Sequence, residues 1–237
     1  MMLDGKCILI TGAARDIGLA AVRACLEIGG EVLVTDVDGG ALDEAIDGLR
    51  ATGFQPRHAA LDVNDQGSIA TALSTVTDWA ALDVLINNAA LLDISHAATI
   101  DDIRWNRVLD VNLTGALRVT QAALPLLRKA PSPSVVNTIS TQAFQGVPQS
   151  AAYATAKGGL MMLTRSMAAD FGADGIIDTR MALMEDGEHM IDAGRIPLRR
   201  VGTPKDCAGA FVFLASDLSP YITGQAIAVD GGLSATY

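Results

Sequence analysis

The sequence predicts an α/β protein built on a doubly wound parallel sheet. Short apolar runs of four to seven residues alternate with amphipathic stretches of ten or more residues, a pattern typical of βαβ units. Right-handed crossovers between such units give an open sheet that helices cover on both faces. The chain has 237 residues, half of them apolar, and no Pro/Ser-rich linker. We therefore expect a single domain over residues 1–237.

The expected elements alternate along the whole chain. Strands are predicted at residues 7–10, 31–35, 58–62, 82–87, 134–140 and 226–230. The first is wholly apolar, as suits a parallel strand that is buried on both faces. Helices are predicted at residues 18–28, 40–52, 66–78, 103–128, 152–171 and 204–216, where apolar side chains recur at helical spacing. Pro125 lies near the end of the 103–128 helix, where a kink or stop is expected.

Composition excludes several classes of function. The net charge of −10 argues against a protein that binds nucleic acid or an anionic membrane. Three cysteines without paired spacing argue against a disulfide framework or a zinc site, and we expect no metal. No targeting segment and no run of about 18 apolar residues is seen. A soluble, cytoplasmic protein is expected.

A glycine-containing turn, residues 11–18, joins the first strand to the first helix. Such a turn lets backbone N–H groups and the helix dipole face a pyrophosphate, with Gly12 in the tight turn and Gly18 allowing close helix packing. Asp36 ends the next strand, 18 residues after Gly18, where an acid can bind the adenosine ribose. The sequence therefore predicts a dinucleotide site, and an ordinary connecting loop is the alternative.

The same turn bears on the choice of cofactor. Asp36 favours a free ribose 2′-hydroxyl and hence NAD. Arg15, a basic residue in the turn, could instead meet the 2′-phosphate of NADP, or could be a solvated loop cation. NAD is the prediction and NADP the less favoured alternative.

A tyrosine and a lysine form the candidate catalytic pair. Tyr153 and Lys157 are four residues apart in a predicted helix, so they lie on one face. An ammonium beside a phenol lowers the tyrosine pKa from its usual ~10 and suits a general acid/base. Ser140 ends the predicted 134–140 strand, at the edge where ligands bind in doubly wound sheets.

Taken together, these motifs resemble the short-chain dehydrogenase/reductase family. The resemblance rests on residues 11–18, 62–63, 87–90, 111–112, 140, 153–157, 223–225 and 229–232, in family order over nearly the whole chain. It implies a Rossmann-type fold and an NAD(P)-dependent oxidoreductase that transfers hydride between nicotinamide and a secondary alcohol or carbonyl. The partner implied is a small alcohol or carbonyl compound.

The resemblance also implies roles for individual residues. Tyr153 would exchange the proton, Lys157 would lower its pKa and hold the nicotinamide ribose, and Ser140 would bind the substrate oxygen. Asn112 would hold a water linked to Lys157, or would only pack its amide against a strand. Cofactor contacts are expected from Gly12, Arg15, Asp16, Ile17, Gly18, Asp36, Asp62, Val63, Asn88, Ala89, Ala90, Tyr153, Lys157 and Thr179. Substrate contacts are expected from Ser140, Gln142, Gln149 and Tyr153, in a pocket that Leu91, Leu92, Phe144 and Met184 also line.

The sequence departs from the family pattern at three places. Asp16 replaces the middle glycine of the turn, where it would crowd the pyrophosphate or cap the helix. Ala90 replaces a final glycine. After Gly175, the family's apolar strand and its Pro-Gly are absent, although Thr179 still matches the threonine that follows them. Either residues 176–179 form a shortened sixth strand, or the sequence omits residues of the protein. Residues 181–203 would form a substrate lid.

These departures keep a second hypothesis open, a non-catalytic binding or scaffold subunit with the same fold. A nucleic-acid module is a third hypothesis, which the acidic charge opposes. The resemblance further implies a homotetramer, or a homodimer, assembled through the helices at 103–128 and 153–171 and through the C-terminal strand.

Overall fold

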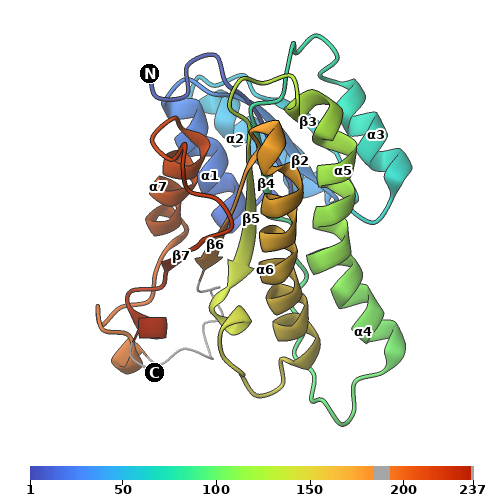
Figure 1. Cartoon of the computed structure of the whole chain (residues 1–237), viewed down its shortest axis with the longest axis vertical. Coiled ribbons are helices and arrows are strands. Elements are labelled where there is room, and N and C mark those ends of the chain that lie inside the picture. The colour runs from blue at the N-terminus through green and yellow to red at the C-terminus, as the bar shows by residue number, and fades with distance from the viewer. Residues whose placement is uncertain (184–192, 236–237) are drawn as a thin grey trace.

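A computed structural model describes residues 1–183 and 193–235. It contains one sheet of seven strands in the order β3-β2-β1-β4-β5-β6-β7, and every pair is parallel (Figure 1). The strands are β1 (Cys7–Ile10), β2 (Glu31–Asp36), β3 (Arg57–Ala60), β4 (Val84–Asn87), β5 (Ser134–Ser140), β6 (Ile177–Leu183) and β7 (Ala226–Val229). The strand order reverses between β1 and β4, which is where such sheets bind ligands.

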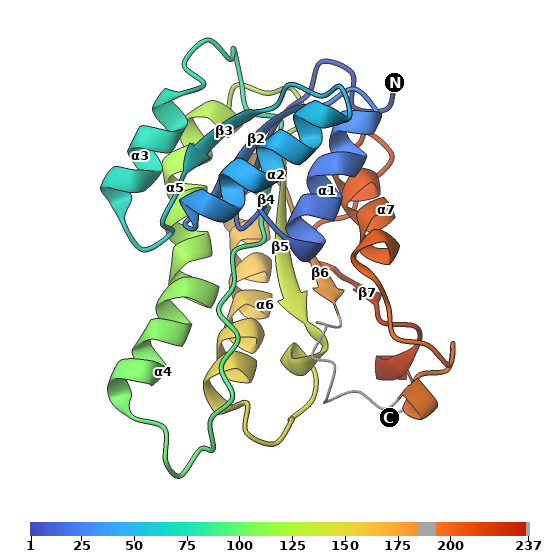
Figure 2. The same ribbon diagram turned by 180° about the vertical axis from the view of Figure 1, so that it is seen from behind.

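Helices cover both faces of the sheet. One face carries α1 (Asp16–Glu27), α2 (Gly39–Ala51) and α7 (Pro204–Ala215), and the other carries α3 (Gln66–Ser74), α4 (Asp102–Leu109), α5 (Gly115–Leu127) and α6 (Ala151–Phe171), as Figures 1 and 2 show. Ile8 and Ile10 of β1 face the first layer, and Leu9 between them faces the second. Two cores therefore share each central strand, which explains why these strands are apolar throughout. No helix in the described part of the chain has the length and apolarity to cross a bilayer.

Aspartates at helix starts explain several element boundaries. Asp38, Asp65 and Asp101 each precede a helix, and each accepts a hydrogen bond from a backbone N–H of its first turn. These bonds satisfy N–H groups that have no partner within the helix. At α7, Thr203 and Asp206 form a reciprocal capping box.

The helix expected at residues 103–128 is bent. It consists of α4, a π-helical turn at Asp110–Thr114, and α5. A Cβ added at Gly115 would lie 2.6 Å from a methyl carbon of Val63, so this glycine lets α5 pack closely against the loop after β3. The π turn places Asn112 on the inner side, where it is buried. Pro125 lies inside α5 and does not end it.

The sixth strand differs from what the sequence suggested. β6 has seven residues and pairs with β5 over its whole length, from Ser134 opposite Ile177 to Ser140 opposite Leu183. The expectation of a shortened strand at residues 176–179 is therefore wrong, and the backbone runs continuously into β6. The physical reason is that β5 and β7 would otherwise leave buried N–H and C=O groups without partners. Residues 181–183, expected to begin a lid, complete the strand instead, and residues 184–192 of that expected lid lie outside the described residues.

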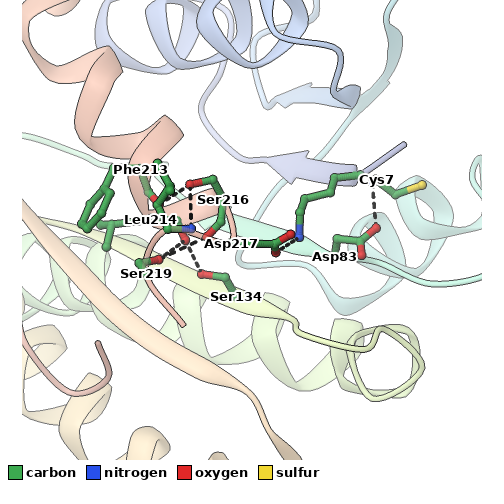
Figure 3. Close-up of polar contacts among 10 residues, drawn as sticks. Cys7, Asp83, Ser134, Phe213, Leu214, Ser216, Asp217 and Ser219 are labelled. Carbon is green, nitrogen blue, oxygen red and sulfur yellow. Dashed lines mark hydrogen bonds and ion pairs between the residues drawn. The ribbon is translucent and has the colours of Figure 1, made fainter. Parts of the chain in front are cut away.

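Polar contacts at the amino ends of the strands join β1 to the residue before β4, and join β1 and β5 to the end of α7 and the residues after it (Figure 3). Lys6 donates to Asp217 over 2.8 Å, the Cys7 N–H donates to Asp83 over 2.9 Å, and Ser134 Oγ donates to the Leu214 carbonyl over 3.0 Å. Burial, and then the nearby carboxylates, raise the pKa of the Cys7 thiol to about 11. Cys7 is thus a protonated packing residue at neutral pH.

Candidate active site

The candidate site lies at the carboxyl ends of β1 and β4, beside the turn at residues 11–18. A cavity of about 650 Å³ opens there, a size typical of ligand sites. Thr11 Oγ1 accepts hydrogen bonds from the backbone N–H groups of Asn88 and Ala89, both over 3.1 Å. The turn after β1 is therefore locked to the segment after β4.

Two glycines of the turn are required by close backbone contacts. Gly12 has a φ of +60°, and a Cβ there would lie 2.6 Å from the Ala89 Cα. At Gly18 a Cβ would lie 2.2 Å from the Gly12 carbonyl oxygen and 2.7 Å from Asn88 Nδ2. Asn88 Nδ2 also donates to that carbonyl over 2.8 Å. Side chains are thus excluded from both positions, and backbone lines the cavity.

Asp16 has a left-handed backbone conformation of the kind that favours glycine. Its φ is +46°, in the left-handed region that aspartate tolerates better than most side chains. Asp16 is the first residue of α1, and Arg15 occupies the N-cap position. The exposed carboxylate therefore does not cap α1, although it lies at the positive end of the helix dipole.

The acid at the end of β2 is held by backbone N–H groups. Asp36 accepts from Ala14 N over 3.1 Å and from Asp38 N over 3.0 Å. Asp38 forms an ion pair of 2.8 Å with Arg15. The Ala41 N–H and the Arg15 guanidinium hold the pKa of Asp38 below its usual range. Arg15 is thereby paired with a carboxylate next to the predicted ribose position.

The cavity gathers most of the predicted cofactor residues. It is lined by Gly12, Arg15, Asp16, Ile17, Gly18, Asp36, Asp62, Val63, Asn88, Ala89 and Ala90. Four further residues that the sequence did not predict also line it: Val37, Asp38, Asn64 and Arg107. Arg107 and Val111 are four residues apart and face the cavity together, so helical spacing from the Val111–Asn112 motif could have found Arg107.

The candidate catalytic side chains are buried together beyond this cavity. Ser140 ends β5, and its Oγ accepts from Gln142 N over 3.2 Å. Tyr153 and Lys157 lie on α6 with exposed fractions of 0% and 1%. Lys157 Nζ donates to the Thr138 carbonyl over 2.9 Å and lies 5.5 Å from the centre of the Tyr153 ring.

Asn112 uses its side chain to hold the backbone. Its Nδ2 donates to the carbonyls of Leu91 and Val108, both over 2.9 Å, and its Oδ1 accepts from Leu91 N over 3.2 Å. Both amide N–H groups are therefore occupied. A water at residue 112 would therefore bind the remaining lone pair of Oδ1 or the main chain.

The remaining predicted site residues differ in their burial and in their distance from the cavity. Gln142 is half-buried beside Ser140, and Gln149 is exposed with a φ of +61°. Thr179 lies opposite Val136 within β6, not at the carboxyl edge where the cofactor cavity lies. The reason is that residues 177–183 fill the strand position. Met184 lies outside the described residues.

A second cavity, of about 520 Å³ and mostly apolar, lies at the start of α7 and shares Ile17 with the first.

A nicotinamide dinucleotide fits these residues. At Gly12 and Gly18 an added Cβ would collide with backbone atoms. Without side chains at these positions, a pyrophosphate can approach the backbone closely. The carboxylate of Asp36 provides an acceptor for a ribose hydroxyl.

Comparisons with known proteins agree with this geometry. Residues 12–234 match the family model described as enoyl-(acyl carrier protein) reductase. The chain is 33% identical to 2-(S)-hydroxypropyl-CoM dehydrogenase 3 of Xanthobacter autotrophicus, over 98% of each chain. It is 33% identical to the 3-oxoacyl-[acyl-carrier-protein] reductase of Thermotoga maritima, over 98% of this chain and 99% of that one.

A solved structure extends the agreement to the fold. The gluconate 5-dehydrogenase of Burkholderia cenocepacia, in complex with NADP and tartrate, superposes with a TM-score of 0.92 at 30% identity, covering 99% of this chain and 97% of that one. The named relatives are oxidoreductases, which favours the catalytic hypothesis over a non-catalytic scaffold. The chain therefore belongs to the short-chain dehydrogenase/reductase family and is an NAD(P)-dependent oxidoreductase.

Proposed function

We propose that Tyr153 is the general acid/base of this oxidoreductase and that its substrate is a secondary alcohol or the corresponding ketone. The observation that carries the proposal is the burial of Lys157 beside Tyr153, next to Ser140 at the end of β5. When bound, the nicotinamide accepts or supplies the hydride.

The side chains have separate tasks in this proposal. Ser140 Oγ donates to the substrate oxygen and orients it toward the Tyr153 phenol. The phenolate takes the hydroxyl proton during oxidation and returns it during reduction. Lys157, held by the Thr138 carbonyl, keeps the phenolate stable near neutral pH. Because Tyr153 is fully buried, a substrate reaches it only when surrounding side chains move apart.

We infer that the preferred cofactor is NAD. Two carboxylates, Asp36 and Asp38, line the cavity at the carboxyl end of β2, and both would repel a 2′-phosphate. Arg15 is already paired with Asp38, which supports NAD over the NADP found in one solved relative. We expect the cofactor to contact the predicted residues that line this cavity, from Gly12 to Ala90 in the sequence. Tyr153 and Lys157 would lie at the nicotinamide end.

The proposal is tested with Tyr153→Phe and Asp36→Ala. Removing the phenol oxygen should lower kcat by about 10²–10⁴-fold, while the Kd for NADH measured by fluorescence titration stays within twofold of wild type. Asp36→Ala should weaken the binding of NADH and strengthen the binding of NADPH. Undiminished turnover of Tyr153→Phe on any substrate that wild type converts would refute the assignment.

The assembly and the location of the enzyme are also proposed. Ile103 of α4 and Met162 of α6 are large apolar side chains with exposed fractions of 83% and 54%, which supports pairing through these helices into a homotetramer or homodimer. The sheet takes strands from both ends of the chain, which supports one domain over residues 1–237. All three cysteines are thiols, as in a reducing cytoplasm. Light scattering of the purified protein tests the assembly.

A further inference from the structure

A buried carboxylate lies in the segment between β4 and α4, outside the set of catalytic groups. Asp93 has an exposed fraction of 6%. Its Oδ1 accepts from Arg104 Nε on α4, and its Oδ2 accepts from the Ser95 hydroxyl. Arg104 also donates through Nη2 to the Ile94 carbonyl over 3.2 Å. Burying a charge is costly unless it is paired, and breaking such a pair leaves the cost uncompensated.

The bent helix over α4, the π turn and α5 holds this segment by hydrogen bonds at two points. Asn112, in the π turn, binds both the N–H and the carbonyl of Leu91, and Arg104, in α4, binds Asp93 and Ile94. Figure 2 shows the segment passing between α4 and α6. Residues 91–96 are thus fixed relative to the helix, although the segment is not a helix or strand itself.

The segment then contacts the residues that begin α6. Ser95 N donates to the Gln149 carbonyl over 2.8 Å, and Ser95 forms a parallel bridge with Ser150. Gln149 has a φ of +61°, a conformation that a non-glycine residue keeps only when its surroundings hold it. Ser95 supplies one such contact.

From residues 149–150 two short paths lead to the reacting groups. Ser150 directly precedes α6, whose first turn carries Tyr153. The Ser150 hydroxyl also donates to Gln142 Oε1, and Gln142 N donates to Ser140 Oγ over 3.2 Å. Movement of Ser150 would therefore displace both Tyr153 and Ser140.

We propose that Asp93, clamped by Arg104 and Ser95, is a positioning residue that holds Ser140 and Tyr153 in the geometry for proton transfer. The inference rests on the proposed roles of those two residues. Asp93 acts through Ser95 and residues 149–150, and the cofactor cavity does not include it. Misplacing reacting groups by about 1 Å can slow catalysis by about 10²-fold, so the clamp should affect kcat and leave cofactor binding intact.

The experiment compares Asp93→Asn, Arg104→Gln and the double variant in the full-length enzyme. Each single change should lower kcat at least tenfold, with the NADH Kd within twofold of wild type. The double variant should lose no more than the worse single variant, because both changes break one contact. The pH at which kcat is half-maximal should also shift, since the distance between Ser140 and Tyr153 changes. Asp217→Asn, which breaks the exposed Lys6 pair at the opposite edge, is the matched control and should retain wild-type kcat.

Several outcomes would overturn the proposal. Wild-type kcat in a folded Asp93→Asn or Arg104→Gln enzyme is one. Equal losses in kcat and NADH affinity, with an unchanged pH profile, are another, because they indicate a merely structural role. If Asp93→Asn does not fold, Arg104→Gln decides, since that side chain is half exposed. Tyr153→Phe, run in parallel, shows separately whether the proposed chemistry itself fails.

Discussion

Replacing Asp16 by glycine should strengthen cofactor binding and leave the fold at least as stable. A φ of +46° costs an ordinary residue about 1 kcal/mol, and aspartate somewhat less. Glycine removes this cost, but it also removes a carboxylate from the positive end of α1, worth about 0.5 kcal/mol. The free energy of unfolding should therefore rise by about 0–0.5 kcal/mol, measured by urea denaturation.

The effect on binding comes from charge. Asp16 lines the cavity proposed for the pyrophosphate. Two like charges about 4 Å apart repel by about 1 kcal/mol even in bulk water. Removing the carboxylate should lower the NADH Kd roughly fivefold, and salt should reduce the gain. Asp16→Asn removes the charge and keeps a side chain that tolerates positive φ, so it separates charge from strain. NADH binding by both variants that is no tighter than wild type would refute this reasoning.

Three further changes test other parts of the structure. Arg107→Ala should weaken the binding of NADH and of NADPH alike by about fivefold at low salt. It removes a cation that would attract the anionic cofactor into a cavity rich in carboxylates. A loss of affinity that does not depend on salt would contradict this. Gly18→Ala should cost about 1–3 kcal/mol in urea unfolding, since its Cβ would lie 2.2 Å from the Gly12 carbonyl; unchanged stability would argue against the close approach. The Arg200 guanidinium, and then Thr203, lower the pKa of Asp206, so this carboxylate stabilises the fold above pH ~4 and the stability is lost as pH falls toward the lowered pKa. Asp206→Asn should flatten the fall in Tm between pH 5 and pH 2, and parallel curves would contradict the assignment.

The features that local sequence patterns encode were predicted closely. Gly12, Gly18 and Asp36 could be placed because strand, turn and helix follow one another directly, and the cavity contains all three. Tyr153 and Lys157 could be paired because four residues make one helical turn, and they lie together in α6.

Features that depend on distant partners were missed. The exact course of β6 depends on the unpaired edges of β5 and β7, which lie far away in the sequence. The bend at residues 110–114 depends on packing around the loop after β3. Arg107 of α4 and Asp38, which precedes α2, line one cavity because elements far apart in the sequence meet there.

The sequence by itself determined the doubly wound sheet, the glycine-containing turn after β1 and the Tyr153–Lys157 pair, since each follows from spacing along a single element or a single βα connection. Only the tertiary structure decided that Thr179 lies within a strand, that Asn112 holds Leu91, and that Asp93 is buried against Arg104. These facts depend on which segments meet in space, and such meetings are set by the competition for buried hydrogen bonds and apolar contacts over the whole chain.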